Sequence, residues 1–398
     1  MILMEKSEKV HVETYWRSAN KHHEELCGDR VLLRRTEESL VAVLADGLGS
    51  GVKANILSTL TSTIIGEMLY SGLSVEDAVE TILATLPVDK ERDLAYSTFT
   101  IVQVFYDGRT YISQSGNPDL VMLRKGKIFH PAEETKVLFG RKVKTSFLEV
   151  YPGDCIVVCS DGIEHAGLGI SNSFGWGVRN LEKFLAEQYS EDMNARVMSG
   201  MILDYAKKLY MNQPGDDSTL ICLRILEPVE NRILIGPPSD PAMDDEVVSA
   251  LVSCKGKKIC CGGSTSSMVA RVTKKELRPE SLADMIPGVP PKGYIDGIDL
   301  VTEGVLTLQQ TDMMLRRSLE DYHFLEYLMD TQDRDGASML SKTLLNLSEI
   351  TFMIGLSNNP SHDAIAYSPI SFTAKLAVID EIMDCLKKLG KIVRVEQY

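Results

Sequence analysis

A seven-residue turn between an apolar run and a helix-like segment constrains this chain more than any other feature. The run Leu40 to Leu44 reads as a buried strand and leads into Ala45-Asp46-Gly47-Leu48-Gly49-Ser50-Gly51. Residues Ala54 to Leu69 then follow with helical character. An acid at a strand end, next to glycines and a helix N-terminus, brings a carboxylate, close backbone groups and partial positive charge together. A plain strand-to-helix turn has the same local pattern, so the rest of the chain must decide.

Size and charge bound the class of protein. The 398 residues are 44% hydrophobic, which is enough for a large core and favours two domains over one. The formal charge of -14 argues against nonspecific binding to nucleic acid or to an anionic membrane. No apolar run approaches the roughly 18 to 20 residues that span a bilayer, and charges interrupt the N-terminus early. We therefore expect a cytoplasmic protein with neither nucleic-acid nor membrane partners.

Eight cysteines are scattered without a CxxC pair, and several lie inside apolar, strand-like runs. This distribution favours buried, reduced thiols over a soft-metal site. The adjacent Cys260 and Cys261 leave a redox role open, although neighbours on a strand face opposite sides. Near the N-terminus a polar segment holds His11, His22 and His23, whose spacing fits no helical ligand pair, so we expect them on a solvated surface.

The first half of the chain alternates between strand-like and helix-like segments. Its expected strands are Val31–Leu33, Leu40–Leu44, Thr98–Tyr106, Thr110–Gln114, Leu120–Leu123, Val143–Val150, Asp154–Ser160 and Leu220–Leu226. Its expected helices are Ala54–Leu69, Val75–Leu86, Leu181–Tyr189 and Ala195–Leu209.

Acids that stand beside a glycine or at a strand end recur along this half: Asp29, Asp46, Asp161, Asp216 and Asp217. Carboxylate oxygens, with the backbone carbonyl of Gly47, suit Mg²⁺ or Mn²⁺ better than zinc. Carboxylates held close together repel one another strongly without cations. Two ions bridged by one carboxylate would form the arrangement that hydrolyses phosphate esters. Any one Asp-Gly pair taken alone is more often a structural turn.

Five motifs in order resemble the metal-dependent protein phosphatases of type 2C, and most closely their SpoIIE-like bacterial branch. They are Cys27-Gly28-Asp29, Ala45 to Gly51, Ser115-Gly116-Asn117-Pro118, Ser160-Asp161-Gly162 and Gly215-Asp216-Asp217-Ser218-Thr219. The resemblance covers roughly Val10 to Glu227. It implies an αββα sandwich of two antiparallel sheets flanked by helices, with two Mn²⁺ or Mg²⁺ ions at one end.

Carried over by position, the resemblance implies a role for each motif acid. Asp46 would bridge both metals and Gly47 would offer its carbonyl. Asp29 would complete one metal, Asp161 and Asp216 would hold the other, and Asp217 would support them. Asp46, Asp161 and Asp216 form the predicted catalytic set.

Two motifs depart from the branch. Asn117 replaces a frequent histidine, and Glu164-His165-Ala166 replaces Thr-Glu-Ala. His165 could act as a general acid, but a structural role is the favoured interpretation. No early arginine stands out as a phosphate clamp, which leaves substrate affinity unexplained.

The resemblance ends near Pro228, so we expect a phosphatase domain at 1–228 and a smaller α/β domain, regulatory or partner-binding, at 229–398. Gly236 to Pro241 reads as a boundary turn or linker. Gly262-Gly263-Ser264-Thr265 lies between a strand and a helix and could hold a phosphate, although an ordinary capped turn is favoured. The other expected elements are helices at Asp245–Val252, Leu306–Met329 and Leu376–Leu389, with strands at Lys258–Cys261 and Tyr294–Val301.

The leading hypothesis is Mn²⁺- or Mg²⁺-dependent hydrolysis of phosphoserine or phosphothreonine in a regulatory phosphoprotein. The alternative is a metal-binding module that recognises a phosphoprotein or ligand with little or no turnover. A homodimer through the helices after Gly51 is left open by the sequence.

Overall fold

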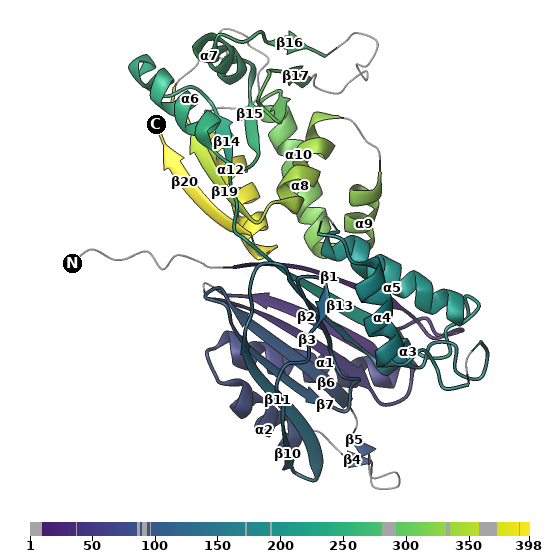
Figure 1. The fold of residues 1–398 in the computed structure, drawn as a ribbon. Coiled ribbons are helices and arrows are strands. Elements are labelled where there is room, and N and C mark those ends of the chain that lie inside the picture. The colour runs from purple at the N-terminus through teal and green to yellow at the C-terminus, as the bar shows by residue number, and fades with distance from the viewer. Residues whose placement is uncertain are drawn as a thin grey trace. The chain divides into compact units, whose positions relative to one another are not determined.

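The chain divides into two compact units, Met1–Pro228 and Val229–Tyr398 (Figure 1). This computed structural model describes residues 10–36, 38–85, 88–89, 94–95, 97–171, 173–191, 193–280, 292–331, 335–357, 372–389 and 391–398. None of the helices in these ranges is both long enough and apolar enough to cross a membrane.

Two antiparallel sheets form the centre of the first unit. The five-stranded sheet runs in the order β1 (His11–Ala19), β13 (Ser218–Leu226), β12 (Asp154–Cys159), β8 (Val121–Arg124) and β9 (Lys127–Ile128). The six-stranded sheet runs β10 (Glu134–Leu138), β11 (Arg141–Glu149), β7 (Arg109–Ser115), β6 (Ser97–Phe105), β3 (Ser39–Gly47) and β2 (Asp29–Arg35). A separate short pair is formed by β4 (Val88–Asp89) and β5 (Leu94–Ala95).

Helices cover the outer faces of both sheets. Helices α1 (Gly51–Tyr70) and α2 (Val75–Thr85) pack on the six-stranded sheet. The five-stranded sheet packs on α4 (Val178–Gln188) and α5 (Ala195–Leu209), and a short α3 (Asp161–Glu164) follows β12. A further apolar cluster fills the space between the sheets. The predicted αββα sandwich is confirmed.

Strand β3 shows why its sequence is a continuous apolar run rather than an alternating one. Leu40 and Leu44 belong to the core between the sheets. Val41 and Val43 belong to the core beneath α1 and α2. Both faces of the strand are therefore buried, and each needs apolar side chains. This central strand delivers Asp46 to one end of the sandwich.

The second unit is a mixed sheet with helices on both faces, which confirms the α/β prediction. Its order is β16 (Arg278–Pro279), β17 (Lys292–Tyr294), β18 (Leu300–Thr302), β15 (Lys258–Cys261), β14 (Glu230–Ile235), β19 (Glu349–Ile354) and β20 (Ile392–Gln397). From β18 to β20 the pairs are parallel, so in chain order these strands lie 3-2-1-4-5, a doubly wound arrangement. One face packs on α6 (Asp244–Ser253) and α7 (Gly263–Thr273), and the other on α8 (Val305–Glu320), α10 (Gly336–Asn346) and α12 (Phe372–Lys388). The turn η1 (Pro241–Met243) precedes α6.

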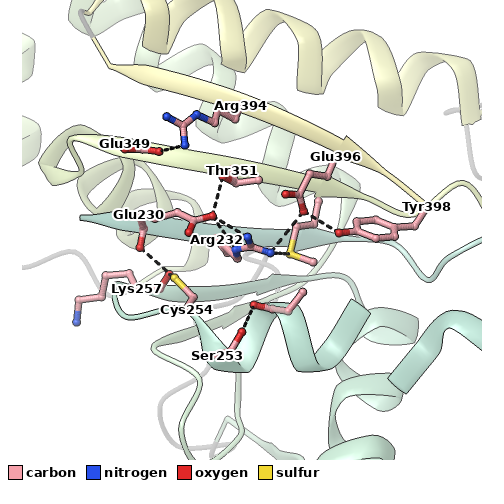
Figure 2. A network of polar contacts seen from close by, with 12 residues as sticks. Glu230, Arg232, Ser253, Cys254, Lys257, Glu349, Thr351, Arg394, Glu396 and Tyr398 are labelled. Carbon is pink, nitrogen blue, oxygen red and sulfur yellow. Dashed lines mark hydrogen bonds and ion pairs between the residues drawn. The ribbon is translucent and has the colours of Figure 1, made fainter. Parts of the chain in front are cut away.

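A polar network links β14, β19 and the edge strand β20 of this sheet (Figure 2). Arg232 on β14 pairs with Glu230 at 2.8 Å and with Glu396 on β20 at 3.4 Å. The hydroxyl of Tyr398 donates to Glu396 at 2.7 Å. On β19, Glu349 pairs with Arg394 of β20 at 2.6 Å. These ion pairs connect β14 and β19 to β20, so they hold β20 at the edge of the sheet.

Several expected elements were wrong in position. The polar N-terminal segment contains the edge strand β1, and His11, which pairs with Leu226 of β13, is only 4% exposed. His22 and His23 are exposed as expected. Gly236 to Pro241 is not a boundary linker, because β14 precedes it inside the second unit.

Two further elements were split. The expected strand Tyr294–Val301 is two strands, β17 and β18, separated by a turn. The expected helix Leu306–Met329 breaks at Asp321, whose side chain accepts from the Phe324 amide at 3.1 Å and starts α9 (Tyr322–Asp330). Helix α2 ends at Thr85, and the expected last residue, Leu86, lies outside the described residues.

The cysteine prediction is confirmed. All eight thiols are free, and only Cys27 is not fully buried. Cys260 packs in the cluster beneath α6 and α7, whereas Cys261 packs in the cluster beneath α8 and α12. The two neighbours thus face opposite sides of the sheet, out of disulfide geometry.

Candidate active site and metal centre

The motif acids of the first unit meet at one end of the sandwich. Asp29 on β2 and Asp46 on β3 are directly opposite in the antiparallel register. Asp161 follows β12 and Asp216 precedes β13, two strands that pair through Cys159 and Leu220. The Ser160 hydroxyl donates to Asp29 Oδ2 at 2.7 Å, which joins the two sheets at this point. Four distant chain segments therefore bring carboxyl groups to the same edge.

Asp46 is at the electrostatic centre of this group. Burial, followed by the charges of Asp29, Asp161 and Asp216 in that order, raises its pKa to about 9. Like charges directly opposite on neighbouring strands are destabilising, so the Asp29–Asp46 pair has no structural benefit by itself. A positive charge at this point would favour the ionised forms and lower the pKa values.

Asp29 offers an oxygen to this centre. Burial raises the pKa of Asp29 to about 7, against the opposing effect of the Ser160 hydroxyl. The second oxygen, Oδ1, is buried and accepts no hydrogen bond from any residue that the structure describes. A buried carboxylate oxygen without a donor is costly unless a cation meets it. This oxygen fits the hard-oxygen ligand set of Mg²⁺ or Mn²⁺.

The outer acids are more exposed. Burial, followed by the charge of Asp161, raises the pKa of Asp216, and the nearby Lys21 opposes this rise. Asp161 Oδ2 lies 3.9 Å from His165 Nδ1. This distance is too long for a hydrogen bond, and the half-exposed ring of His165 is open to solvent.

Asp217 differs from the other four acids, because the backbone already occupies both of its oxygens. Oδ1 accepts from the Lys21 amide and Oδ2 from the Gly28 amide, each at 2.8 Å. These bonds tie the segment before Asp29 to the start of β13. A positioning role suits Asp217 better than direct ligation.

Glycines at the site have a packing reason that the sequence did not reveal. A Cβ on Gly47 would lie 2.1 Å from the carbonyl oxygen of Ala54 in α1. On Gly162 it would lie 2.1 Å from the carbonyl oxygen of Asp217. The sequence suggested that Gly47 keeps its carbonyl open to a ligand. The structure adds that Gly47 lets α1 pack directly against the end of β3.

Asn117, which departs from the branch pattern, supports β3 from the side. Its amide nitrogen donates to the carbonyl of Leu44 at 3.4 Å and to the Thr100 hydroxyl at 3.2 Å. Its amide oxygen accepts from the Thr98 hydroxyl. Asn117 therefore links β6 to β3 two residues before Asp46.

Lys21 is a candidate site residue that sequence reasoning missed. Its ammonium nitrogen lies 3.9 Å from Asp216 Oδ1. The neighbouring His22 amide donates to the carbonyl of Pro214 at 2.8 Å, which holds this segment beside the acids. The only sequence signal was a lysine in a polar segment, and the contact arises from the pairing of β1 with β13.

The carboxyl groups converge without forming a complete ligand shell. In the described ranges, no three His, Cys, Asp or Glu side chains are already arranged as ligands of one ion. The fit to a metal therefore rests on the donor chemistry, the free buried oxygen of Asp29 and the mutual repulsion of the acids.

The sequence left two interpretations of the Gly262–Thr265 turn in the second unit, an ordinary capped turn and a phosphate site, and the structure has features of both. Helix α7 begins at Gly263 after Gly262, which has a φ of 110° and provides no side-chain cap. The Thr265 hydroxyl accepts from the Gly236 amide at 2.9 Å, so this side chain serves the packing of β14. An ordinary turn stays the favoured interpretation, and phosphate binding stays the alternative, which calorimetric titration with ATP or GTP can test.

Comparison with known proteins finds similar proteins for the first unit. Residues 36–226 match the family model described as Stage II sporulation protein E (SpoIIE). Phosphoserine phosphatase RsbX of Bacillus subtilis is 26% identical over 167 residues, which are 41% of this chain and 79% of RsbX. Stage II sporulation protein E of the same organism is 21% identical over 190 residues, 46% of this chain and 22% of that protein.

Solved structures of the same two relatives are also similar to this chain. The phosphatase domain of Bacillus subtilis SpoIIE, with a fragment of its regulatory domain, has a TM-score of 0.49 and 19% identity. That match covers 56% of this chain and 65% of the SpoIIE structure, so the chain spans less than two thirds of it. A structure of RsbX in complex with magnesium has a TM-score of 0.40 and 22% identity, covering 56% of this chain and all of that one.

The sandwich, the ordered motifs, the family-model match and the similarity to RsbX together identify the first unit as a SpoIIE-like, type 2C protein serine/threonine phosphatase.

Proposed function

We propose that the first unit hydrolyses phosphoserine or phosphothreonine in a regulatory phosphoprotein, with two Mn²⁺ or Mg²⁺ ions at the acid cluster. The observation that supports this most strongly is the position of Asp46, opposite Asp29 and within the field of Asp161 and Asp216. The relative RsbX is named a phosphoserine phosphatase, and one of its structures contains magnesium.

Each acid has a distinct part in this proposal. Asp46 would contact both ions, with the carbonyl of Gly47 and the free oxygen of Asp29 on one side. Asp161 and Asp216 would hold the other side. When bound, the ions supply positive charge that makes a water molecule more acidic and offsets the charge of the phosphate. Asp217 keeps the Gly28–Asp29 segment in place through the two amides that it accepts.

Lys21 supplies the phosphate contact that the sequence left unexplained. Its ammonium is half-exposed at the edge of the cluster, beside Asp216. An ammonium at this position can attract a phosphate monoester and orient one of its oxygens. His165 lies on the other side of Asp161, where it can donate a proton to a leaving group.

The test combines hydrolysis with direct metal binding. Phosphate release from a phosphoserine peptide should require Mn²⁺ or Mg²⁺, and Asp46→Asn should reduce it about 100-fold or more. In a calorimetric titration the same variant should bind Mn²⁺ more weakly. Asp217→Asn should cost less activity than Asp46→Asn but lower the thermal stability. Full hydrolysis by Asp46→Asn, or the reverse ranking of the two variants, would overturn the assignment.

The alternative function predicts a different result in the same assay. A recognition module would bind the phosphopeptide tightly in the presence of Mn²⁺ and release no phosphate. Wild-type protein that releases phosphate catalytically excludes this alternative.

A further inference from the structure

A groove of the first unit lies outside the acid cluster and has no part in the proposed chemistry. It is a cavity of about 410 Å³ between α2 and the outer face of β7, β11 and β10, and we call it the α2–β11 groove. Helix α1 covers β2, β3 and β6, and α2 contacts β7. The groove lies beside α2, with β7, β11 and β10 as its floor.

The floor follows from the strand register. Tyr111 and Ser113 on β7 face Phe147 and Thr145 on β11 as direct partners. Tyr111 and Phe147 pack their rings 4.7 Å apart, and Phe147 remains 60% exposed. Aromatic surface of this kind is typical of binding sites and is costly to leave in water.

A polar group in the floor has no partner. Ser113 is 0% exposed, and its hydroxyl makes no hydrogen bond with any described residue. Ser113 therefore lies beneath the surface of the cavity, and the exposed part of the floor is formed by larger side chains such as Phe147.

The rim is acidic once its ion pairs are counted. Lys136 at the rim pairs with Glu134 at 3.5 Å. Glu76 and Glu80 of α2 are exposed, and within the described part of the chain neither has an ion-pair partner. The uncompensated charge at the groove is therefore negative, which complements a basic partner.

Apolar surface extends beyond the cavity. Phe139, in the turn from β10 to β11, is 65% exposed, directly after Leu138 at the end of the groove floor. Strand β10 is at the edge of its sheet, with one side open to pairing. An extended chain segment would cover this larger area, whereas a small molecule would fill only the cavity.

The groove also leads towards the acid cluster. Ser113 is two residues before Ser115 on β7, about 7 Å along the strand. Gly116 and Asn117 follow, and Asn117 contacts β3 beside Asp46. A partner segment seated in the groove would thus hold its neighbouring residues near the proposed catalytic edge.

We propose that the α2–β11 groove docks a segment of the phosphoprotein substrate that combines basic and large apolar side chains. This proposal rests on the proposed function, because it assigns to the groove the choice of that same enzyme's substrate. Docking outside the catalytic edge raises kcat/KM for the protein substrate through KM and leaves small phosphate esters unaffected.

The test uses synthetic phosphoserine peptides with the same phosphorylated core. In one set, a Gly-Ser spacer joins the core to a flank of Leu, Phe, Lys and Arg, placed before the core in some peptides and after it in others. A matched set has Glu in place of Lys and Arg. The wild-type chain should show a kcat/KM about fivefold higher for the basic flank, expressed in KM. Glu76→Gln/Glu80→Gln should remove most of this preference. Glu187→Gln, an exposed glutamate on α4 over the other sheet, should retain it.

Two readouts separate this proposal from the catalytic one. p-Nitrophenyl phosphate reports hydrolysis without docking, so its turnover by the double variant should equal that of wild type. Fluorescence anisotropy with the unphosphorylated basic flank reports docking without hydrolysis. If wild type hydrolyses no ester but binds this peptide, the proposed function fails and the docking surface stands.

Three results would overturn the docking proposal. One is equal kcat/KM for basic and acidic flanks in wild type. A second is a preference that survives in the double variant. The third is a different occupant of the groove. Binding of dodecylammonium without binding of the peptide would indicate a small molecule. Self-association in analytical ultracentrifugation that Phe147→Ser abolishes would indicate a second copy of the chain.

Discussion

Asp29 and Asp46 are placed where electrostatics alone would not place two acids. They face each other on adjacent strands, and burial raises the pKa of both. Folding therefore puts two carboxyl groups into an environment that disfavours their charges. The arrangement becomes favourable only when positive charge joins it, which is the physical basis for proposing a metal centre here.

The substitution Gly47→Ala tests whether the end of β3 depends on close packing against α1. In Gly47→Ala, the added methyl group would meet the carbonyl of Ala54, so α1 must move away from β3. We expect unfolding free energy to fall by about 3 kcal/mol, since the clash involves backbone rather than a flexible side chain. Urea denaturation measures this loss.

Gly200→Ala is the matched control for that substitution. Gly200 lies inside α5, and its added Cβ would approach only the flexible side chain of Arg17, at 3.3 Å. Helix propensity should make this change neutral or stabilising by up to about 1 kcal/mol. Equal destabilisation by both substitutions would contradict the packing argument for Gly47.

Lys21 is predicted to act on substrate affinity. Lys21→Met retains the packing of the aliphatic chain and removes the charge beside Asp216. We expect KM for p-nitrophenyl phosphate to rise about three- to tenfold with little change in kcat, the size expected for a half-exposed cation. Steady-state kinetics at saturating Mn²⁺ measure this, with Lys208→Met on α5 as the control. An unchanged KM would remove Lys21 from the site.

At the scale of elements, sequence reasoning succeeded where one pattern decided the outcome. Strand β3 and helix α1 were found because a doubly buried strand and an Asp-Gly turn both leave local signals. Strand β1 was missed because its many polar residues and the buried His11 resemble a surface segment, while the pairing partner lies about 200 residues away. The break at Asp321 was missed because apolar periodicity continues across it, and only the cap to Phe324 shows the new start.

Strand β15 gives a prediction on thiol chemistry. Burial raises the pKa values of Cys260 and Cys261 to about 12. Their protonated forms therefore favour the folded state, and this stabilisation is complete below pH 9 and decreases as pH rises towards 12. At pH 8, Ellman's reagent should leave both thiols unmodified in the native chain and modify both in guanidinium chloride. Rapid native modification, mapped by mass spectrometry, would contradict the burial.

For the molecule as a whole, the division into two units predicts that the first unit can carry out its proposed hydrolysis without the second. Each unit has its own sheets and its own apolar cores. The acid cluster and the α2–β11 groove draw only on the first unit. The sequence pointed to the ligand chemistry through its motifs, but it could not show Lys21 or the free Asp29 oxygen, which depend on long-range pairing.

A fragment of residues 1–228 should therefore fold alone and hydrolyse p-nitrophenyl phosphate with kcat/KM within about threefold of the full chain. Circular dichroism and steady-state kinetics measure the two properties. A folded but inactive fragment would show that the second unit contributes directly to the catalytic edge. In that case the proposed regulatory or partner-binding role for residues 229–398 would need revision.

The most direct test of the metal centre is a crystal of the full chain soaked in Mn²⁺, with diffraction recorded at the manganese absorption edge. We expect two anomalous peaks that share Asp46 as a ligand, one also bound by Asp29 and the other by Asp161 and Asp216. Anomalous density elsewhere, or none at this edge of the sandwich, would contradict it.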